Sequence, residues 1–162
     1  MKVLGVAVSS GVLYYGALNA PDGLTGPTII PDAPERLVPA EGLDGAGWLL
    51  DTFERITQDI RTLEPEAIAL VGTRKYSQWK YREAVDRISL ISALMLSCAQ
   101  QSVAYRELTT EQIGKAVALS PSSLFSFSYE TIGLTQRPTH WTAGRGAAFA
   151  AALAYAVDRS QN

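Results

Sequence analysis

Residues 2–19 read KVLGVAVSSGVLYYGALN, two apolar runs on either side of Ser9-Ser10-Gly11. The first run is apolar on both faces of an extended chain, which is typical of a strand covered on both sides of its sheet. The second run is rich in β-branched and aromatic residues, which favour strands. The pattern predicts two β-strands joined by a tight turn, with the first strand in the interior of a sheet.

The next part of the chain predicts one more strand and a helix. Asn19-Ala20-Pro21-Asp22-Gly23 is a turn signal, so we expect a third strand within residues 24–30 that pairs back on the second. Three prolines between residues 31 and 42 predict a surface connection. A helix over about 44–63, with Asp44 as N-cap, follows from apolar residues at steps of four and three. Its expected buried face consists of Leu49, Phe53, Ile56, Ile60 and Leu63.

After Glu64-Pro65, strands and helices alternate. The short apolar run over 67–72 predicts a buried parallel strand, and a long helix is expected over about 78–100 with Ser77 as its N-cap. A further strand over 103–108 precedes a Thr109-x-x-Gln112 capping box and a short helix. Residues 118–142 show no regular pattern, and an alanine-rich helix is expected over 143–159. This order predicts an α/β fold, with a mixed five-stranded sheet flanked by helices in a single domain over 1–162.

Composition restricts the class of protein. The 162 residues carry a net charge of −2 and are 47% hydrophobic, as expected for a globular chain without general attraction to nucleic acid or anionic membrane. The single cysteine, Cys98, lies in an apolar run and is expected to be a buried thiol. We see neither a signal peptide nor an apolar stretch of membrane-spanning length, and we expect a cytoplasmic protein that does not bind membranes.

One segment combines basic and aromatic side chains. Five of the fourteen Lys and Arg residues lie between positions 74 and 87, beside three aromatic residues. Cations neutralise phosphates and aromatic rings stack on exposed bases, so the segment is a candidate nucleic-acid interface. The alternative is a solvated helix entry with one ring packed inward. The candidate residues are Arg74, Lys75, Tyr76, Trp79, Lys80 and Arg82.

Outside this segment, the sequence has few candidate residues for catalysis or ligand binding. The only histidine, His140, has no assignable serine or cysteine partner, and we expect a structural or exposed role. Arg137, Arg145 and His140-Trp141 could add a second basic and aromatic edge. No nucleotide-binding glycine loop or zinc-ligand spacing occurs, so no cofactor is expected.

Four short segments resemble the RuvC-like Holliday-junction resolvase family, which has a ribonuclease H-like fold. Residues 4–7 (LGVA) and 15–18 (YGAL) are similar to its first two strands. Residues 63–71 (LEPEAIALV) are similar to its helix end, proline and fourth strand, and residues 150–157 (AAALAYAV) to its last helix. The resemblance implies a ribonuclease H-like fold over most of the chain.

The same comparison shows where this chain departs from the family. In the family, acidic residues on the first strand, the fourth strand and the last helix hold two metal ions that activate water. The matching positions here are Ala7 and Val71, with Ala148 and Ala151 on the last helix. Hard cations require oxygen ligands, which these side chains lack. We therefore expect no catalytic residues, no metal site and a pseudo-nuclease.

Three functions remain open at this stage. The first is a catalytically inactive RuvC-like domain that binds nucleic acid, with branched or single-stranded DNA favoured by the resemblance. The second is an interaction or scaffolding domain, in which the apolar helix segment 88–98 or the aromatic loop 124–129 docks a protein partner. The third is an active nuclease that uses displaced acids such as Glu107 or Asp158. The family's resolvases are dimers, so a homodimer is also possible here.

Overall fold

The computed structural model describes residues 1–21, 26–74 and 78–161. Strands β1 (Lys2–Ser9) and β2 (Val12–Asn19) form the predicted antiparallel hairpin, with Ser9 paired to Val12 across the turn. Ser10 and Gly11 have φ values of 50° and 72°, the two positive angles that a two-residue type I′ turn requires. This turn fixes the register of the hairpin and therefore the face on which each side chain lies.

Over the described residues the sheet has six strands, one more than expected. Its order is β3 (Thr28–Ile29), β2, β1, β5 (Ala67–Val71) and β6 (Ala104–Leu108), and β4 (Arg36–Leu37) also pairs with β2. Strands β1, β5 and β6 are parallel, and the other pairs are antiparallel, so the predicted mixed sheet is confirmed. The connection over 31–42 was wrongly expected to lack strands. Two residues between prolines carry no recognisable strand pattern.

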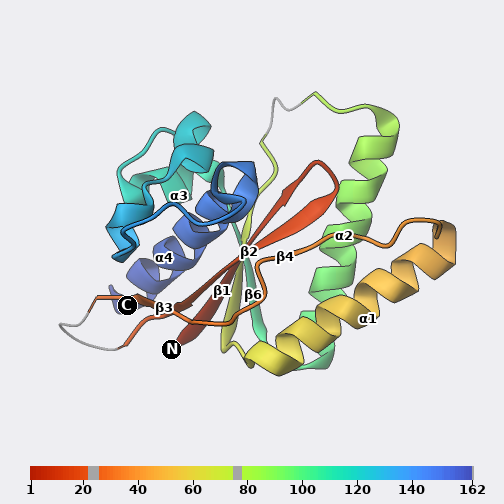
Figure 1. Cartoon of the computed structure of the whole chain (residues 1–162), viewed down its shortest axis with the longest axis horizontal. Coiled ribbons are helices and arrows are strands. Elements are labelled where there is room, and N and C mark those ends of the chain that lie inside the picture. Colours follow the sequence, from red (N-terminus) through yellow and green to blue (C-terminus); the bar gives the residue numbers. More distant parts are fainter. Residues whose placement is uncertain (22–25, 75–77, 162) are drawn as a thin grey trace.

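Helices cover both faces of the sheet (Figure 1). Helices α1 (Gly45–Leu63) and α2 (Tyr81–Gln100) lie on one face, and α3 (Thr110–Val117) and α4 (Gly146–Ser160) lie on the other. Alternate residues of β1 enter the two cores, so Leu4 and Val6 pack under α1 and α2, whereas Val3 and Ala7 pack under α4. The interior position predicted for β1 is confirmed.

The long helices differ from prediction at their starts. Helix α1 follows Asp44 as expected, but the Asp44 side chain makes no capping bond, and Leu49, expected on the buried face, is exposed. Helix α2 begins at Tyr81 rather than near residue 78, because Lys80 is the N-cap and its backbone N–H donates to the carboxylate of Glu83 at 3.2 Å. The predicted cap at Ser77 lies outside the described residues.

Helix α2 has a buried side and an exposed apolar side. Leu90, Leu94 and Cys98 are buried against the sheet, and burial raises the pKa of the Cys98 thiol to about 12. The exposed apolar residues of the helix are Tyr81, Val85, Ile88, Met95 and Leu96. The helix is therefore not fully covered within the described chain. None of the helices described is long and apolar enough to cross a membrane.

The irregular segment between α3 and α4 forms short turns with an aromatic core. The predicted capping box is confirmed, because Thr109 Oγ1 accepts from the Gln112 N–H at 3.1 Å and Gln112 Oε1 accepts from the Thr109 N–H at 2.8 Å. Two 3₁₀ turns follow, η1 (Pro121–Ser126) and η2 (Tyr129–Ile132). A π turn, η3 (Trp141–Arg145), then delays the start of α4 by three residues relative to the prediction.

Helix α4 lies directly on the backbone of the first two strands. A Cβ atom added to Gly5 would fall 1.7 Å from the carbonyl oxygen of Ala148, and one added to Gly16 would fall 2.5 Å from the backbone nitrogen of Phe149. Only glycine permits this approach, which brings the alanine-rich face of α4 against β1 and β2.

Candidate nucleic-acid interface

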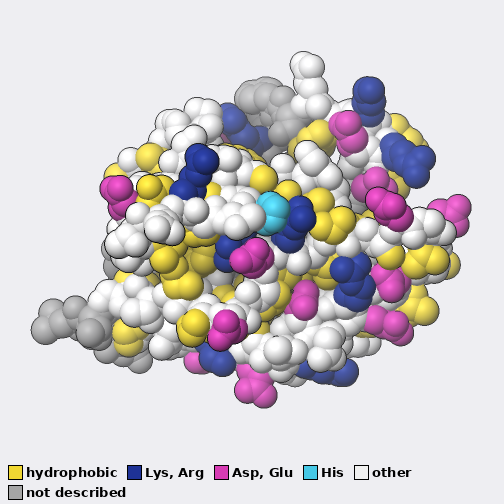
Figure 2. Space-filling view, viewed as in Figure 1, with side chains coloured by type: hydrophobic (Ala, Val, Ile, Leu, Met, Phe, Trp, Pro, Cys, Tyr) yellow, Lys and Arg dark blue, Asp and Glu magenta, His cyan; other side chains and the backbone are white. Residues whose placement is uncertain are grey.

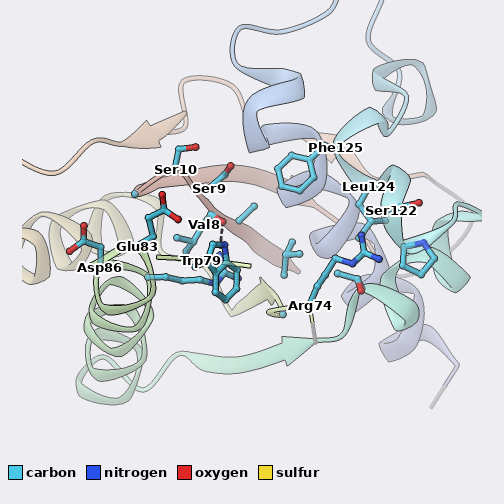
Figure 3. A pocket seen from close by; sticks show the side chains of 17 residues that line it. Val8, Ser9, Ser10, Arg74, Trp79, Glu83, Asp86, Ser122, Leu124 and Phe125 are labelled. Atoms are coloured by element: carbon cyan, nitrogen blue, oxygen red, sulfur yellow. Dashed lines mark hydrogen bonds between the residues drawn. The ribbon is translucent and has the colours of Figure 1, made fainter. Parts of the chain in front are cut away.

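A hollow of about 570 Å³ lies at the edge of the sheet where β1 and β5 end. The parallel strands β1, β5 and β6 all present their carboxyl ends at this edge, the usual place for ligands in α/β folds. Helix α2 forms one wall and the η1 turn forms the opposite wall (Figure 3). The strand ends contribute Ala7, Val8, Val71 and Gly72.

The four residues that the sequence resemblance matches to the family's acids lie in one cluster next to this hollow. Ala7 and Val71 line it, and both point to the α4 side of the sheet, where they join Ala148 and Ala151 in one buried apolar cluster. All four side chains are at most 6% exposed. Over the residues that the structure describes, no group of three or more His, Cys, Asp or Glu side chains could hold a metal ion.

Arg87 joins the wall of the hollow to the end of β1. Its Nη1 donates to the carbonyl oxygen of Val8 at 2.6 Å, and its Nε donates to Thr73 Oγ1 at 2.9 Å. The guanidinium also lies 5.1 Å from the centre of the Trp79 ring. Burial lowers the pKa of Arg87, and the carboxylate of Glu107 opposes that shift. Arginine remains protonated in such a setting, so it supplies a fixed positive charge.

The structure separates the predicted interface residues into three groups. Arg74 and Trp79 line the hollow. Lys80 and Arg82 are exposed nearby, at the start of α2, and do not line it. Lys75 and Tyr76 lie outside the described residues.

The positive charge at this site is local. Arg74, Lys80 and Arg82 make no ion pair with any residue that the structure describes. Figure 2 shows Lys and Arg side chains near the start of α2 with acidic side chains beside them, rather than a surface of one sign. This agrees with a chain of net charge −2, in which attraction for an anion must come from a few placed cations.

Solved structures with the same architecture were found by comparison of the whole chain. Thermus thermophilus RuvC matches with a TM-score of 0.78 and 18% sequence identity, covering 99% of this chain and 97% of that chain. T. thermophilus RuvC in complex with a Holliday junction substrate matches with a TM-score of 0.78 and 17% identity, covering 99% and 96% of the two chains. Fowlpox virus resolvase, in a Holliday junction DNA complex, has a TM-score of 0.58 and 10% identity, covering 98% and 99%.

The fold is ribonuclease H-like and of the RuvC type. No protein-family model matches the chain, and no curated protein matches its sequence. The resemblance inferred from short segments is therefore confirmed at the level of the fold. The likeness extends over nearly the full length of both chains, so the edge with the hollow belongs to the shared architecture.

The sheet places Glu107 and Asp158, the two acids that an alternative nuclease site could use, on opposite faces. Asp158 forms an ion pair with Arg106, on the α4 side of the sheet. Glu107, the next residue of β6, must point to the opposite face, where Tyr105 packs with the α1 and α2 core. The two carboxylates therefore do not converge on one site.

No pattern in the sequence indicated the second wall of the hollow. Phe125 is 39% exposed and lines it together with Ser122, both from η1. Four apolar residues in an irregular segment gave no periodicity from which to tell the outward ring from the buried Leu124 and Phe127.

The second basic and aromatic edge is only partly formed, because Arg137 is exposed and His140 is partly exposed, whereas Trp141 and Arg145 are buried. Trp141 is buried and donates from its indole N–H to the carbonyl oxygen of Phe127. Arg145 is buried, donates to the carbonyl oxygen of Tyr15 at 3.3 Å and lies over the Phe149 ring. Both residues hold the π turn in place. His140 precedes them, and its backbone oxygen accepts from the Arg145 N–H at 3.2 Å.

Proposed function

We propose that this chain is a catalytically inactive RuvC-type domain that binds nucleic acid, with branched or single-stranded DNA as the favoured ligand. The observation that carries the proposal is the grouping of Arg74, Trp79, Lys80 and Arg82 around the hollow at the carboxyl edge of the sheet. Cations without acidic partners are available to neutralise phosphates, and a half-exposed indole is available to stack on a base.

Two of the similar structures support DNA as the ligand. One is a complex of T. thermophilus RuvC with a Holliday junction substrate, and the other is a complex of fowlpox virus resolvase with Holliday junction DNA. A shared fold raises the expectation of a shared class of ligand, but function depends on the site itself. In this chain, Arg74, Lys80 and Arg82 can bind phosphates and Trp79 can stack on a base, so these side chains are the part of the site that suits DNA.

The proposal of inactivity rests on the residues at the four acid positions. Mg²⁺ and Mn²⁺ bind carboxylate, carbonyl and water oxygens, and the side chains of Ala7, Val71, Ala148 and Ala151 provide none. The residues present therefore do not fit a two-metal centre. Incubation of labelled junction and single-stranded DNA with Mg²⁺ or Mn²⁺ should leave the strands intact. Cleavage that disappears on changing Glu107 or Asp158 would overturn the assignment.

Binding is tested by fluorescence anisotropy with labelled single-stranded, duplex and four-way-junction DNA across a salt series. Three phosphate contacts give a slope of log K against log salt of about −2 for single strands, so a fourfold rise in salt should weaken binding by about 20-fold. The double variant Arg74→Glu/Lys80→Glu should abolish this binding. The control Arg61→Glu/Lys115→Glu makes the same change of charge at two exposed residues away from the hollow, and should bind nearly normally.

Two results would decide against the proposal. One is the absence of binding to all three DNAs at low salt. The other is equal loss of binding in the two charge variants, which would indicate general repulsion rather than an interface. In either case the interaction-domain alternative becomes the better account.

That alternative is favoured by the exposed apolar side of α2. Tyr81, Val85, Ile88 and Met95 recur at steps of four, three and seven, the spacing of a helix that packs against another helix. Ile88 is 64% exposed. A homodimer through this side of α2 would cover these residues. Light scattering after size exclusion should then give twice the monomer mass, and Ile88→Glu should restore the monomer mass. A wild-type monomer at high concentration would decide against it.

A further inference from the structure

The hollow has two half-exposed aromatic side chains on opposite walls. Trp79 precedes α2 and is 42% exposed, and Phe125 belongs to η1 and is 39% exposed. Figure 3 shows Trp79 on the α2 side of the hollow and Phe125 on the η1 side, with the Arg74 side chain reaching toward Leu124 and Ser122 of the η1 wall. We propose that the hollow is a pocket for one unpaired base of the bound nucleic acid, an inference that rests on the function proposed above.

The Trp79 wall is fixed before any ligand arrives. Arg87 lies over the Trp79 ring at 5.1 Å and is itself held by the Val8 carbonyl oxygen and by Thr73 Oγ1. A ring that is already held loses little conformational entropy when a second flat group stacks on it. The side of the indole away from Arg87 is therefore a prepared stacking surface.

The Phe125 wall is anchored by its neighbours. Leu124 and Phe127 are buried in the core under α4, while Phe125 between them is turned outward into the hollow. An outward phenylalanine with buried residues close on both sides has a backbone that cannot easily move away. Ligand pockets are lined predominantly by apolar and aromatic side chains, and this wall supplies one.

The floor of the hollow is apolar, whereas the carboxylates of Glu83 and Asp86 line its α2 wall and can accept hydrogen bonds from the amino groups of a base. Ala7 and Val71 present only methyl groups, so a flat π-system can approach without repulsion and without a metal ion. Hydroxyl groups of Ser9, Ser10 and Ser122 surround this floor and can donate to or accept from a base edge. The volume of about 570 Å³ lies within the roughly 300–1,000 Å³ that is usual for small-molecule pockets.

Arg74 supplies the remaining contact. Its side chain lines the hollow and makes no ion pair with any residue described, so it can meet the phosphate attached to an inserted base. An unpaired base is available in a single strand or at a branch point and need not be pulled from a duplex. The pocket therefore selects DNA with unpaired bases.

The test compares two oligonucleotides of equal length and charge, one with all its bases and one abasic throughout. Stacking on aromatic side chains corresponds to about 5- to 150-fold in affinity per base, so the wild-type protein should bind the intact oligonucleotide at least fivefold more tightly. Phe125→Ala should remove most of that preference and leave binding of the abasic oligonucleotide unchanged. The control Tyr81→Ala alters an aromatic side chain outside the hollow that is 86% exposed, and should keep the preference.

A second measurement uses the wild-type protein alone, in case Phe125→Ala does not fold. Iodide should quench Trp79 fluorescence in the free protein, and the intact oligonucleotide should protect it while the abasic one does not. Trp141 is buried and should not respond, and the partly buried Trp48 of α1, which does not line the hollow, should be quenched equally with either oligonucleotide. Equal, salt-sensitive binding of both oligonucleotides would overturn the pocket and leave nucleic-acid binding in place. Failure to bind either one would overturn both proposals.

Discussion

Replacing Gly5 by alanine should destabilise the protein strongly, because β1 and α4 touch through this residue. The added Cβ would lie 1.7 Å from the Ala148 carbonyl oxygen and 2.6 Å from its carbonyl carbon. Both are backbone atoms of a helix, so no side chain can rotate to make room. A contact of 3.0 Å, already very tight, requires the helix to withdraw by about 1.3 Å.

That withdrawal determines the size of the effect. Nine residues of α4 are buried, and a radial gap of 0.5–1 Å already loses about a quarter to a half of the dispersion energy of a contact. Overpacking of a core typically lowers the free energy of unfolding by about 1–3 kcal/mol. A clash with backbone atoms that cannot rotate away is expected at the upper end of that range. We expect the free energy of unfolding to fall by about 3 kcal/mol. For a chain of this length, that corresponds to a fall in Tm of about 6–12 °C.

Thermal unfolding followed by circular dichroism measures this change, with Gly47→Ala as the control. Gly47 lies in α1, where an added Cβ meets nothing within 4 Å. Alanine is favoured over glycine in a helix by up to about 1 kcal/mol, so this variant should melt slightly higher than the wild type. A Gly5→Ala protein with a Tm within about 2 °C of the wild type would refute the close approach of α4 to β1.

Two further predictions concern buried titratable groups. Cys98 should resist alkylation in the folded protein at pH 8 and react on unfolding, because burial raises the pKa of its thiol to about 12; rapid native labelling would contradict this. Burial also raises the pKa of Asp59, although the Tyr15 hydroxyl donates to it at 3.1 Å. A raised carboxyl pKa stabilises the fold at low pH, and that contribution disappears as pH rises through the folded value. The free energy of unfolding of Asp59→Asn, measured with urea, should therefore rise relative to that of the wild type as pH rises from about 4 to 7. The same difference between the two proteins at every pH would refute this prediction.

The sequence predicted those elements whose local chemistry agrees with the final packing. Ser10-Gly11 allows the two positive φ angles of the hairpin, and Thr109 with Gln112 forms the capping box in full. Glu64 ends α1 with a φ of 51°, next to the proline that excludes further helix. In each case the signal lies within four residues, so no knowledge of distant contacts was needed.

The predictions were wrong for residues whose burial depends on contacts with distant parts of the chain. Leu49 continues the apolar spacing of α1 but lies beyond the part of the helix that meets the sheet, so it is exposed. Arg145 appeared to be a surface cation, yet it is buried because the Tyr15 carbonyl oxygen and the Phe149 ring receive it from other elements. For the same reason, only one wall of the candidate site could be predicted from the sequence. Trp79 stands in a recognisable basic segment, whereas Phe125 reaches the hollow through a fold that spacing does not encode.

The close packing of α4 on β1 and β2 also limits which side chains the chain can carry at four apolar positions. Ala148 and Ala151 are fully buried in an apolar cluster with Ala7 and Val71. A single change of either alanine to aspartate would bury a carboxylate in this apolar cluster, at a cost of several kcal/mol. Net stabilities are only about 5–15 kcal/mol, so such a variant would lose much of its stability. Where α4 meets the sheet, a mutation that adds one acidic side chain therefore has to be compensated by further changes before it can persist.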